Sequence, residues 1–246
     1  MDERSQRYLI VNADDFGQAE GINAGIIAAH EQGIVTSASL MVRWPAATSA
    51  AEYARQHPQL SVGLHIDLGE WAFRNGEWLH VYEVLDSDDP HAISREIRRQ
   101  LEVFRSLCGT DPTHFDSHQH VHREEPIRTI VSDLALELQV PVRHFSSQIR
   151  YCGEFYGQTE EGEPYHEGIS IENLLALLTT FGPGITELAC HPGSGVGTEL
   201  ETQYRAEREV EMKMLCDPRA KEAIMRERII MCTFREIDHR QLLSDG

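Results

Sequence analysis

Metal-binding side chains crowd into one short segment of this sequence, Thr113–His122. Four histidines and one aspartate occupy its alternate positions: His114, Asp116, His118, His120 and His122. Alternate side chains of an extended strand point to one face, so the pattern predicts that these five groups share a face. Unpartnered imidazoles are costly to bury, whereas a divalent metal needs such ligands. The segment therefore indicates a metallohydrolase, with a solvated histidine-rich loop as the alternative.

Two adjacent carboxylates stand at the end of the first apolar run. Asp14 and Asp15 follow Tyr8–Val11, which reads as a buried strand. If the chain turns as it leaves this strand, one carboxylate could bind a metal while the other takes a proton from water. A turn of solvated acids, or a helix N-cap, is the alternative interpretation.

Two further histidines lie at expected strands. His65 stands in the third strand, where a hydrogen-bonded core histidine is the commoner role. Asp67 shares its face and could orient it, or could simply lie in the loop that follows. His191 follows the sixth strand and precedes a glycine-rich loop. Because the ordinary pKa of histidine lies near neutrality, His191 is expected to serve as a general acid. A loop histidine bonded to backbone is the alternative.

A catalytic zinc-type site holds about three protein ligands and keeps one open position. Within the histidine-rich segment we prefer His118, because a strand that begins near Thr113 should end there, and His122 is its nearest rival. The other candidates are expected to bind substrate or support the ligands: Arg143, His120, His122, Asp116, Asp67, Trp71, Trp78 and Tyr151. A structural ion pair for Arg143, and barrel closure or a dimer contact for the aromatic rings, are the alternatives.

Hydrophobic periodicity predicts seven strands that alternate with helices. The strands are expected at 8–11, 34–42, 60–68, from 113, and at 140–145, 185–190 and 228–234, and the helices at 18–32, 46–56, 91–107, 125–138, 170–180, 203–215 and after Pro218. This alternation implies parallel strands with crossover helices, in a barrel or an open doubly wound sheet. No Gly-x-Gly-x-x-Gly or Walker loop follows the first strand, so we favour an irregular barrel of about seven strands.

Two segments interrupt the alternation. Residues 69–83 surround Asn75-Gly76, a pair typical of hairpin turns, and residues 148–168 read as a long aromatic loop. Both follow strands, so in a barrel they would lie at the C-terminal face, where active sites form.

Length and charge narrow the class of protein. The 246 residues suit one domain, 1–246, and the net charge of −18 argues against nucleic acid and against anionic membrane surfaces. We find no signal peptide and no apolar run near the ~20 residues of a membrane span. Five cysteines without a Cys-x-x-Cys pair suggest reduced thiols in the cytoplasm. A neutral or weakly charged substrate fits this acidic chain better than an anion.

The assembled motifs resemble those of the YdjC family, which includes the carbohydrate deacetylases called ChbG and the hopanoid-associated HpnK proteins. The matching motifs run from residue 9 to residue 193: Leu-Ile-Val-Asn-Ala-Asp-Asp-Phe-Gly, Gly-Ile-Val-Thr-Ser, Val-Gly-Leu-His, Thr-His-Phe-Asp-Ser-His-Gln-His-Val-His and Cys-His-Pro-Gly. The resemblance implies a distorted parallel (β/α) barrel related to NodB-type polysaccharide deacetylases, often dimeric. It also implies one divalent metal, zinc or magnesium, held by Asp15, His65 and His118, with Asp14 as general base and His191 as general acid.

Two departures limit what the resemblance transfers. Chitooligosaccharide-deacetylating members carry histidine where this chain has Gln119, and Ile66-Asp67-Leu68 replaces their Phe-Val-Leu. We therefore expect hydrolysis of an N-acetyl group on an amino sugar or short oligosaccharide, without naming chitobiose. A metal-dependent phosphoesterase is the rival, with two metals about 3.5–4 Å apart. A non-catalytic carbohydrate-binding protein is a third possibility, and glycoside cleavage would leave the histidines unexplained.

Overall fold

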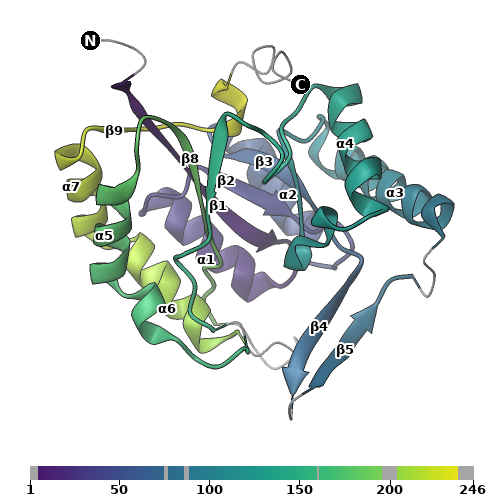
Figure 1. Ribbon diagram of the computed structural model, residues 1–246, viewed down its shortest axis with the longest axis horizontal. Helices are drawn as coiled ribbons and strands as arrows, with labels where there is room; N and C mark the ends of the chain where they lie inside the picture. The colour runs from purple at the N-terminus through teal and green to yellow at the C-terminus, as the bar shows by residue number, and fades with distance from the viewer. Residues whose placement is uncertain (1–4, 75–76, 86–88, 160, 196–203, 238–246) are drawn as a thin grey trace.

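A computed structural model describes residues 5–74, 77–85, 89–159, 161–195 and 204–237, and its centre is one parallel sheet flanked by helices (Figure 1). The sheet has seven strands in the order β6-β3-β2-β1-β8-β7, with β9 also paired to β1. These strands are β1 (Arg7–Phe16), β2 (Ser37–Leu40), β3 (Ser61–Ile66), β6 (Phe115–Ser117), β7 (Ile149–Cys152), β8 (Gly184–Cys190) and β9 (Ile229–Met231). The expected parallel, barrel-type architecture is thus confirmed, as an incomplete barrel in which no described pairing joins β6 to β7.

The strands are connected by helices, as the alternating pattern predicted. The α-helices are α1 (Glu20–Glu31), α2 (Ala47–Gln56), α3 (Pro90–Cys108), α4 (Ile127–Leu138), α5 (Ile171–Thr180), α6 (Ala206–Leu215) and α7 (Pro218–Arg226). Short 3₁₀ turns are η2 (His118–Arg123), η3 (His166–Ile169) and η4 (Phe234–Glu236). Among the described residues, no helix combines the length and the apolar character that a bilayer crossing requires.

The central strand β1 positions the first pair of carboxylates. Its residues from Leu9 to Phe16 are all buried, because strands of parallel sheets are covered on both faces. Along one edge, Arg7–Leu9 pair with β9, and β2 takes over from Asn12 onward. Along the other edge, β8 pairs from Arg7 to Ala13. The carboxyl end of β1 is therefore held between β2 and β8.

The fifth strand differs from the expectation. Residues 140–145 make only one bridge, between Val142 and Phe115, and the strand is instead β7, inside the segment expected to be a loop. The extended chain ends at His144, which has a φ of 70°, a left-handed conformation through which a strand of ordinary residues does not continue. The main sheet still has the predicted seven strands, because β7 takes the place of the strand expected at 140–145.

The histidine-rich segment is also more broken than alternation predicted. The strand β6 ends at Ser117, and Gln119 and His120 follow with φ values of 51° and 55°. The Ser117 hydroxyl accepts the backbone N–H of His122, which closes the turn η2. The expectation that all five polar groups share one face is therefore wrong: only His114 and Asp116 keep the strand direction.

A two-stranded hairpin extends from the body of the molecule beyond β3 (Figure 1). Its strands β4 (Gly69–Arg74) and β5 (Glu77–Glu83) are antiparallel, as the Asn75-Gly76 pair predicted, although those two turn residues lie outside the described part. The backbone of Trp78 pairs with Phe73, and the Trp78 side chain lies outside the described part as well. The hairpin places Trp71 beside the ends of the parallel strands.

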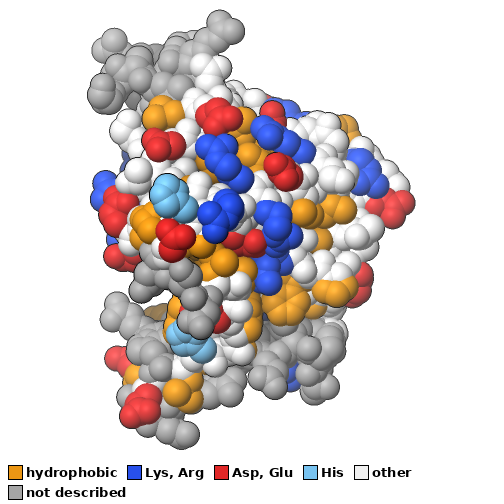
Figure 2. Space-filling model, turned by 90° about the vertical axis from the view of Figure 1, so that its right-hand side faces the viewer, with side chains coloured by type: hydrophobic (Ala, Val, Ile, Leu, Met, Phe, Trp, Pro, Cys, Tyr) orange, Lys and Arg blue, Asp and Glu red, His pale blue; other side chains and the backbone are white. Residues whose placement is uncertain are grey.

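The helix α3 shows why the sequence pattern was readable. Its buried residues Ile93, Ile97, Leu101 and Phe104 recur at helical spacing, and Gly109 ends it with a φ of 75°. Figure 2 turns this side toward the viewer, where basic and acidic side chains are interspersed over the surface. Ion pairs such as Arg98 to Glu137 cross from α3 to α4. The description of residues 1–246 as one domain stays a prediction.

Candidate active site

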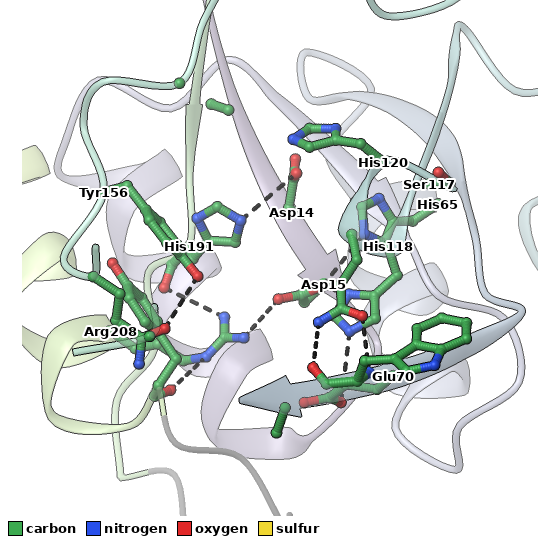
Figure 3. A pocket seen from close by; sticks show the side chains of 18 of the residues that line it. Asp14, Asp15, His65, Glu70, Ser117, His118, His120, Tyr156, His191 and Arg208 are labelled. Atoms are coloured by element: carbon green, nitrogen blue, oxygen red, sulfur yellow. Dashed lines mark hydrogen bonds and ion pairs between the residues drawn. The ribbon is translucent and has the colours of Figure 1, made fainter. Parts of the chain in front are cut away.

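A pocket of about 360 Å³ lies at the carboxyl ends of β1, β3, β6 and β8 (Figure 3). Eight of the residues proposed from the sequence line it: Asp14, Asp15, His65, Trp71, His118, His120, Tyr151 and His191. Other lining residues were not proposed as site residues, and they include Glu70, Tyr156, Tyr204 and Arg208. Parallel strands end together at this edge of the sheet, which is why residues far apart in sequence meet here.

Asp15, His65 and His118 converge on one point in this pocket. The Asp15 Oδ1 atom lies 3.4 Å from His65 Nε2 and 3.1 Å from His118 Nδ1. Zinc ligands at about 2.0–2.2 Å from an ion stand about 3.0–3.5 Å from one another, so these separations fit a single divalent ion. His122, the rival for the third position, lies in a different group with His120 and His144.

The electrostatics of this trio also fit a cation. Burial alone would lower the pKa of both imidazoles, but Asp116 and Asp15 raise the pKa of His65 to about 10. Asp15 and Glu70 likewise raise the pKa of His118 to about 9 against burial. Without an ion, the carboxylates thus draw protons onto both rings, and a divalent ion would replace that charge while releasing the protons.

Asp15 owes its position to the backbone. Its φ of 65° turns the chain at the strand end, so that both it and the preceding Asp14 face the pocket instead of opposite sides of the sheet. Arg208 from α6 donates to Asp15 Oδ2 at 2.6 Å, leaving Oδ1 for the imidazoles. Burial would raise the pKa of Asp15, but Arg208 and His118 hold it well below its usual value.

The imidazole of His65 is oriented by Asp116 and not by Asp67. Asp116 Oδ1 lies 2.9 Å from His65 Nδ1, which leaves Nε2 turned toward Asp15. The strand β3 ends at Ile66, so Asp67 leaves the shared face and accepts hydrogen bonds from Arg43, Trp44 and Tyr82. This carboxylate–histidine arrangement is typical of metal ligands, and Asp67 instead supports the base of the hairpin.

Arg143 sits at the centre of a buried ionic network behind the pocket. Its guanidinium donates to Asp14 at 2.6 and 2.8 Å and pairs with Asp116 at 2.9 Å and Glu187 at 2.6 Å. Burial would raise the pKa of Asp14, but Arg143 lowers it, so Asp14 is ionised at neutral pH. Asp14, His65 and Asp116 also lie close together, yet Arg143 already neutralises both carboxylates there.

His191 faces Asp14 across the pocket, with Nε2 3.7 Å from Asp14 Oδ2 (Figure 3). Burial lowers its pKa to about 4, aided by Arg208 and Arg143 and opposed by Asp14. His191 is therefore neutral at pH 7, and its expected role as general acid stays a prediction. Its backbone N–H donates to Glu211 of α6, and its Nδ1 is buried without a described partner.

The remaining predicted residues divide between the pocket wall and the layer behind it. Tyr151 reaches His120, with its hydroxyl 3.2 Å from Nε2, and its ring packs against the Arg143 guanidinium. Trp71 is joined to η2 through Gln119, which accepts from the Trp71 N–H and donates to its carbonyl. His122 lies behind the wall, between Ser117 and the carbonyl of Arg143.

Sequence reasoning missed the contribution of α6 and of the hairpin. Arg208 and Glu211 are buried in an otherwise charged helix, and Glu70 Oε2 lies 3.5 Å from His118 Nε2. On the sequence alone, such charges look like the solvated face of a helix or a turn. Their three-residue spacing in α6 is the one available signal, because it puts both on the same helical face.

The sequence matches known proteins over most of its length. The profile of the YdjC-like protein family matches residues 8–226. A carbohydrate deacetylase of Geobacillus stearothermophilus is 34% identical, across 94% of this chain and 98% of its own length. A chitooligosaccharide deacetylase of Serratia marcescens is 31% identical, across 94% of this chain and 100% of its own length.

Solved structures share the fold of this chain. A protein of Enterococcus faecalis, described as a proposed cellobiose-phosphate cleavage protein, superposes with a TM-score of 0.75 and 26% identity, over 94% of this chain and 98% of that one. A family 4 carbohydrate esterase of Streptomyces lividans has a TM-score of 0.56 and 9% identity, over 97% and 96%, and shares the fold. As the motif resemblance predicted, this chain belongs to the YdjC-like protein family.

Proposed function

We propose that this protein is a metal-dependent hydrolase that removes the N-acetyl group of an amino sugar or a short oligosaccharide. Relatives named carbohydrate deacetylase and chitooligosaccharide deacetylase support the reaction class. The observation that carries the proposal is the convergence of Asp15, His65 and His118 beside an ionised Asp14. A trio of metal-competent atoms next to a carboxylate is the constellation that amide hydrolysis needs.

Asp15, His65 and His118 are the residues that would hold the metal. Their mixed carboxylate and imidazole donors suit zinc, and magnesium is the second candidate. When bound, such an ion polarises the acetyl carbonyl and makes water a better nucleophile near neutral pH. Arg208 and Asp116 would fix the orientation of the Asp15 and His65 ligands, since each contacts one of them.

Asp14 is the proposed general base. Its two oxygens accept from Arg143, which holds the carboxylate at the pocket wall in ionised form. Asn12 also donates to Asp14 Oδ1 at 2.9 Å. A proton taken from the attacking water would therefore pass to a fixed, buried carboxylate, and the buried Arg143 would limit its movement during the reaction.

His191 is the proposed general acid, but its lowered pKa requires that it first receive the proton it donates. A ring whose pKa is about 4 is neutral at pH 7, so it carries the proton only after receiving it. Asp14, 3.7 Å away, is the available source. As negative charge develops on the acetyl oxygen, the proton affinity of a nearby imidazole rises. His191 would then deliver the proton to the departing amine.

The pocket wall suits a sugar. Trp71, Tyr151 and Tyr156 line it, and aromatic rings with a polar edge can stack on sugar faces and donate hydrogen bonds. We keep as proposals a homodimer and a reduced, cytoplasmic setting, the latter because all five cysteines are unpaired. The phosphoesterase alternative is not favoured, because Arg208, the arginine lining the pocket, is engaged by Asp15.

An acetate-release assay tests the proposed function. Purified protein would be offered N-acetylated mono- and oligosaccharides, after chelation and after return of zinc or magnesium. We expect metal-restored acetate release with at least one substrate, and H118A should lose activity together with the one ion that the Asp15, His65 and His118 trio would hold. H91A, an exposed histidine of α3 outside the pocket, is the matched control. Acetate release that survives chelation, or full activity and metal content in H118A, would contradict the assignment.

A further inference from the structure

A second group of metal-competent side chains lies beside the candidate active site. His120, His122 and His144 offer ring nitrogens that all lie within 4.8 Å of one another. Of the three, only His120 lines the pocket, where it is labelled in Figure 3, and the other two lie behind it. None of the three belongs to the Asp15, His65 and His118 trio.

We propose that His120, His122 and His144 form a second, separate binding site for one zinc-like divalent ion. The ring centroids of the trio are 5.0, 5.8 and 6.0 Å apart. Three imidazoles that bind one ion through nitrogens at about 2.0–2.1 Å place their ring centres roughly 5–6 Å apart. The rings therefore stand about where ligation requires them.

Unsatisfied nitrogens point to a missing partner. His120 Nδ1 and His144 Nε2 are buried and have no hydrogen-bond partner among the described residues. Buried polar atoms in native proteins nearly always have a partner, so these two nitrogens are open to a ligand such as a metal ion. The Tyr151 hydroxyl contacts His120 at Nε2 and so leaves its Nδ1 available.

The backbone conformation supports the same conclusion. His120 and His144 have φ values of 55° and 70°, in a left-handed region that side-chain-bearing residues seldom adopt. Residues in this strained conformation tend to occur at ligand sites. Both loops that present the imidazoles are therefore held in an unfavourable conformation at the presenting residue.

His122 would exchange one existing contact for the ion. Its Nδ1 lies 2.6 Å from the Ser117 hydroxyl, and its Nε2 lies 3.1 Å from the carbonyl oxygen of Arg143. The hydroxyl can rotate about its bond to the Cβ atom, so its hydrogen bond is the easier one to replace. A bond from the other nitrogen to the carbonyl would then fix the ring orientation, as is usual for metal-bound histidine.

Charges of both signs lie near the trio. Burial lowers the pKa of all three rings and Arg143 lowers it further, but Asp14, Asp116 and Glu187 surround that guanidinium at 2.6–2.9 Å and offset its charge. Burial lowers the pKa of His144 to about 4, with Arg123 contributing, so this ring is in the neutral form that binds metal. Three neutral imidazoles favour zinc, copper or nickel and do not suit magnesium or calcium.

Zinc stoichiometry tests the second site without reference to activity. Full-length protein would be stripped of metal, dialysed against zinc, and analysed by inductively coupled plasma mass spectrometry. We expect two zinc ions per wild-type chain and per H91A chain, and one per H144A chain. After dialysis against magnesium instead of zinc, H144A should bind the same number of metal ions per chain as the wild type. One zinc ion in the wild type, or two in H144A, would overturn the proposal.

Two controls separate this site from its neighbour. H118A should keep one zinc ion, whereas loss of both ions would indicate a shared two-metal centre and overturn the proposal. If H144A fails to fold by circular dichroism, zinc-edge anomalous diffraction from wild-type crystals decides. A peak among the three rings supports the site, and its absence there refutes it. Because the readout is bound zinc, failure of the deacetylase assay would leave this result unaffected.

Discussion

One run of ten residues supplies histidines to two neighbouring clusters, and the clusters differ in charge. Before the turn at Gln119, His118 joins Asp15 and His65, with Glu70 and Asp116 close by. After the turn, His120 and His122 meet His144 and Tyr151, and no carboxylate belongs to that trio. Two left-handed residues at the start of η2 separate the groups.

The comparison shows that neighbours, more than residue type, set the chemistry of a histidine. Carboxylates raise the pKa values of His65 and His118 to about 10 and 9 against the effect of burial. Burial lowers those of His122 and His144 to about 4. The first cluster therefore attracts any cation, a proton included, while the second favours metals with affinity for neutral nitrogen.

The largest expected effect comes from Asp14, the carboxylate beside the first cluster. Asp14→Asn removes the proposed base but keeps the size of the side chain, so kcat should fall by about 10²–10⁴-fold. Metal content should stay at the wild-type level, since Asp14 is outside the proposed ligand trio. Steady-state acetate release, with bound metal measured in parallel, checks this.

The proposed difference between the two clusters would be refuted if Asp14→Asn kept wild-type kcat. It would be refuted equally if H144A, in the second cluster, reduced kcat as strongly as Asp14→Asn does. Either result would mean that the charge difference does not separate catalysis from the second cluster.

The second prediction concerns the cation that holds the carboxylates together. Arg143→Met leaves Asp14, Asp116 and Glu187 buried without their common partner, so the free energy of unfolding should fall by about 3–5 kcal/mol. Urea unfolding followed by circular dichroism measures it. A loss below about 1 kcal/mol would show that the network is not held by this charge.

An exposed ion pair is the matched control for Arg143→Met. Arg105 and Asp111 are 2.6 Å apart, but their side chains are 44% and 54% exposed. Arg105→Met should therefore cost less than about 1 kcal/mol, because solvent screens that pair.

The elements were predictable where local pattern decides them. Ile93, Ile97 and Leu101 recur at helical spacing in α3, and Asn75-Gly76 marked the hairpin. The site was predictable to the extent that strand ends of a parallel sheet meet at one edge, which brought together Asp15 and His65. The direction of a side chain after a strand ends is not encoded in alternation, which is why alternation suggested Asp67 as a partner of His65 and did not identify Asp116 in that role.

Long-range partners decided the features that sequence reasoning missed. Arg208 is buried where α6 packs against Asp15, and apart from its three-residue spacing to Glu211 the local sequence of α6 does not distinguish that arginine from a solvated one. Residues 140–145 look strand-like, but the burial of Arg143 among three carboxylates and the left-handed His144 end the extended chain. These are tertiary effects that override local propensity.

The third prediction concerns His114, which belongs to neither proposed ligand trio and whose pKa is lowered by burial. It is fully buried near Asp116, yet burial lowers its pKa to about 3. Since the folded-state pKa lies below the ordinary value, the unfolded chain binds more protons as pH falls from about 6.5, and stability decreases. In His114→Gln, the loss of unfolding free energy between pH 6.5 and 4.5 should be smaller by about 2 kcal/mol.

Urea titrations of both proteins at the two pH values measure this difference. Comparing each protein with itself cancels the cost of the substitution. Equal losses in the two proteins would mean that His114 does not titrate differently in the folded and unfolded states.

The smallest expected effect lies at the turn between the two clusters. Gln119 binds both the N–H and the carbonyl of Trp71, at 2.9 and 2.7 Å, and so ties the hairpin to the residue next to His118. Two hydrogen bonds of this kind contribute on the order of 1–2 kcal/mol. Gln119→Ala should free the pocket wall and raise KM about fivefold, with kcat within about twofold. Gln119→His offers one donor and one acceptor in a different geometry, so its KM should lie between the values of the wild type and Gln119→Ala. Initial rates over a range of substrate concentrations separate the two constants. A large fall in kcat at constant KM would instead mean that Gln119 acts together with the metal ligands. In that case the turn at Gln119 would not separate the functions of the two clusters.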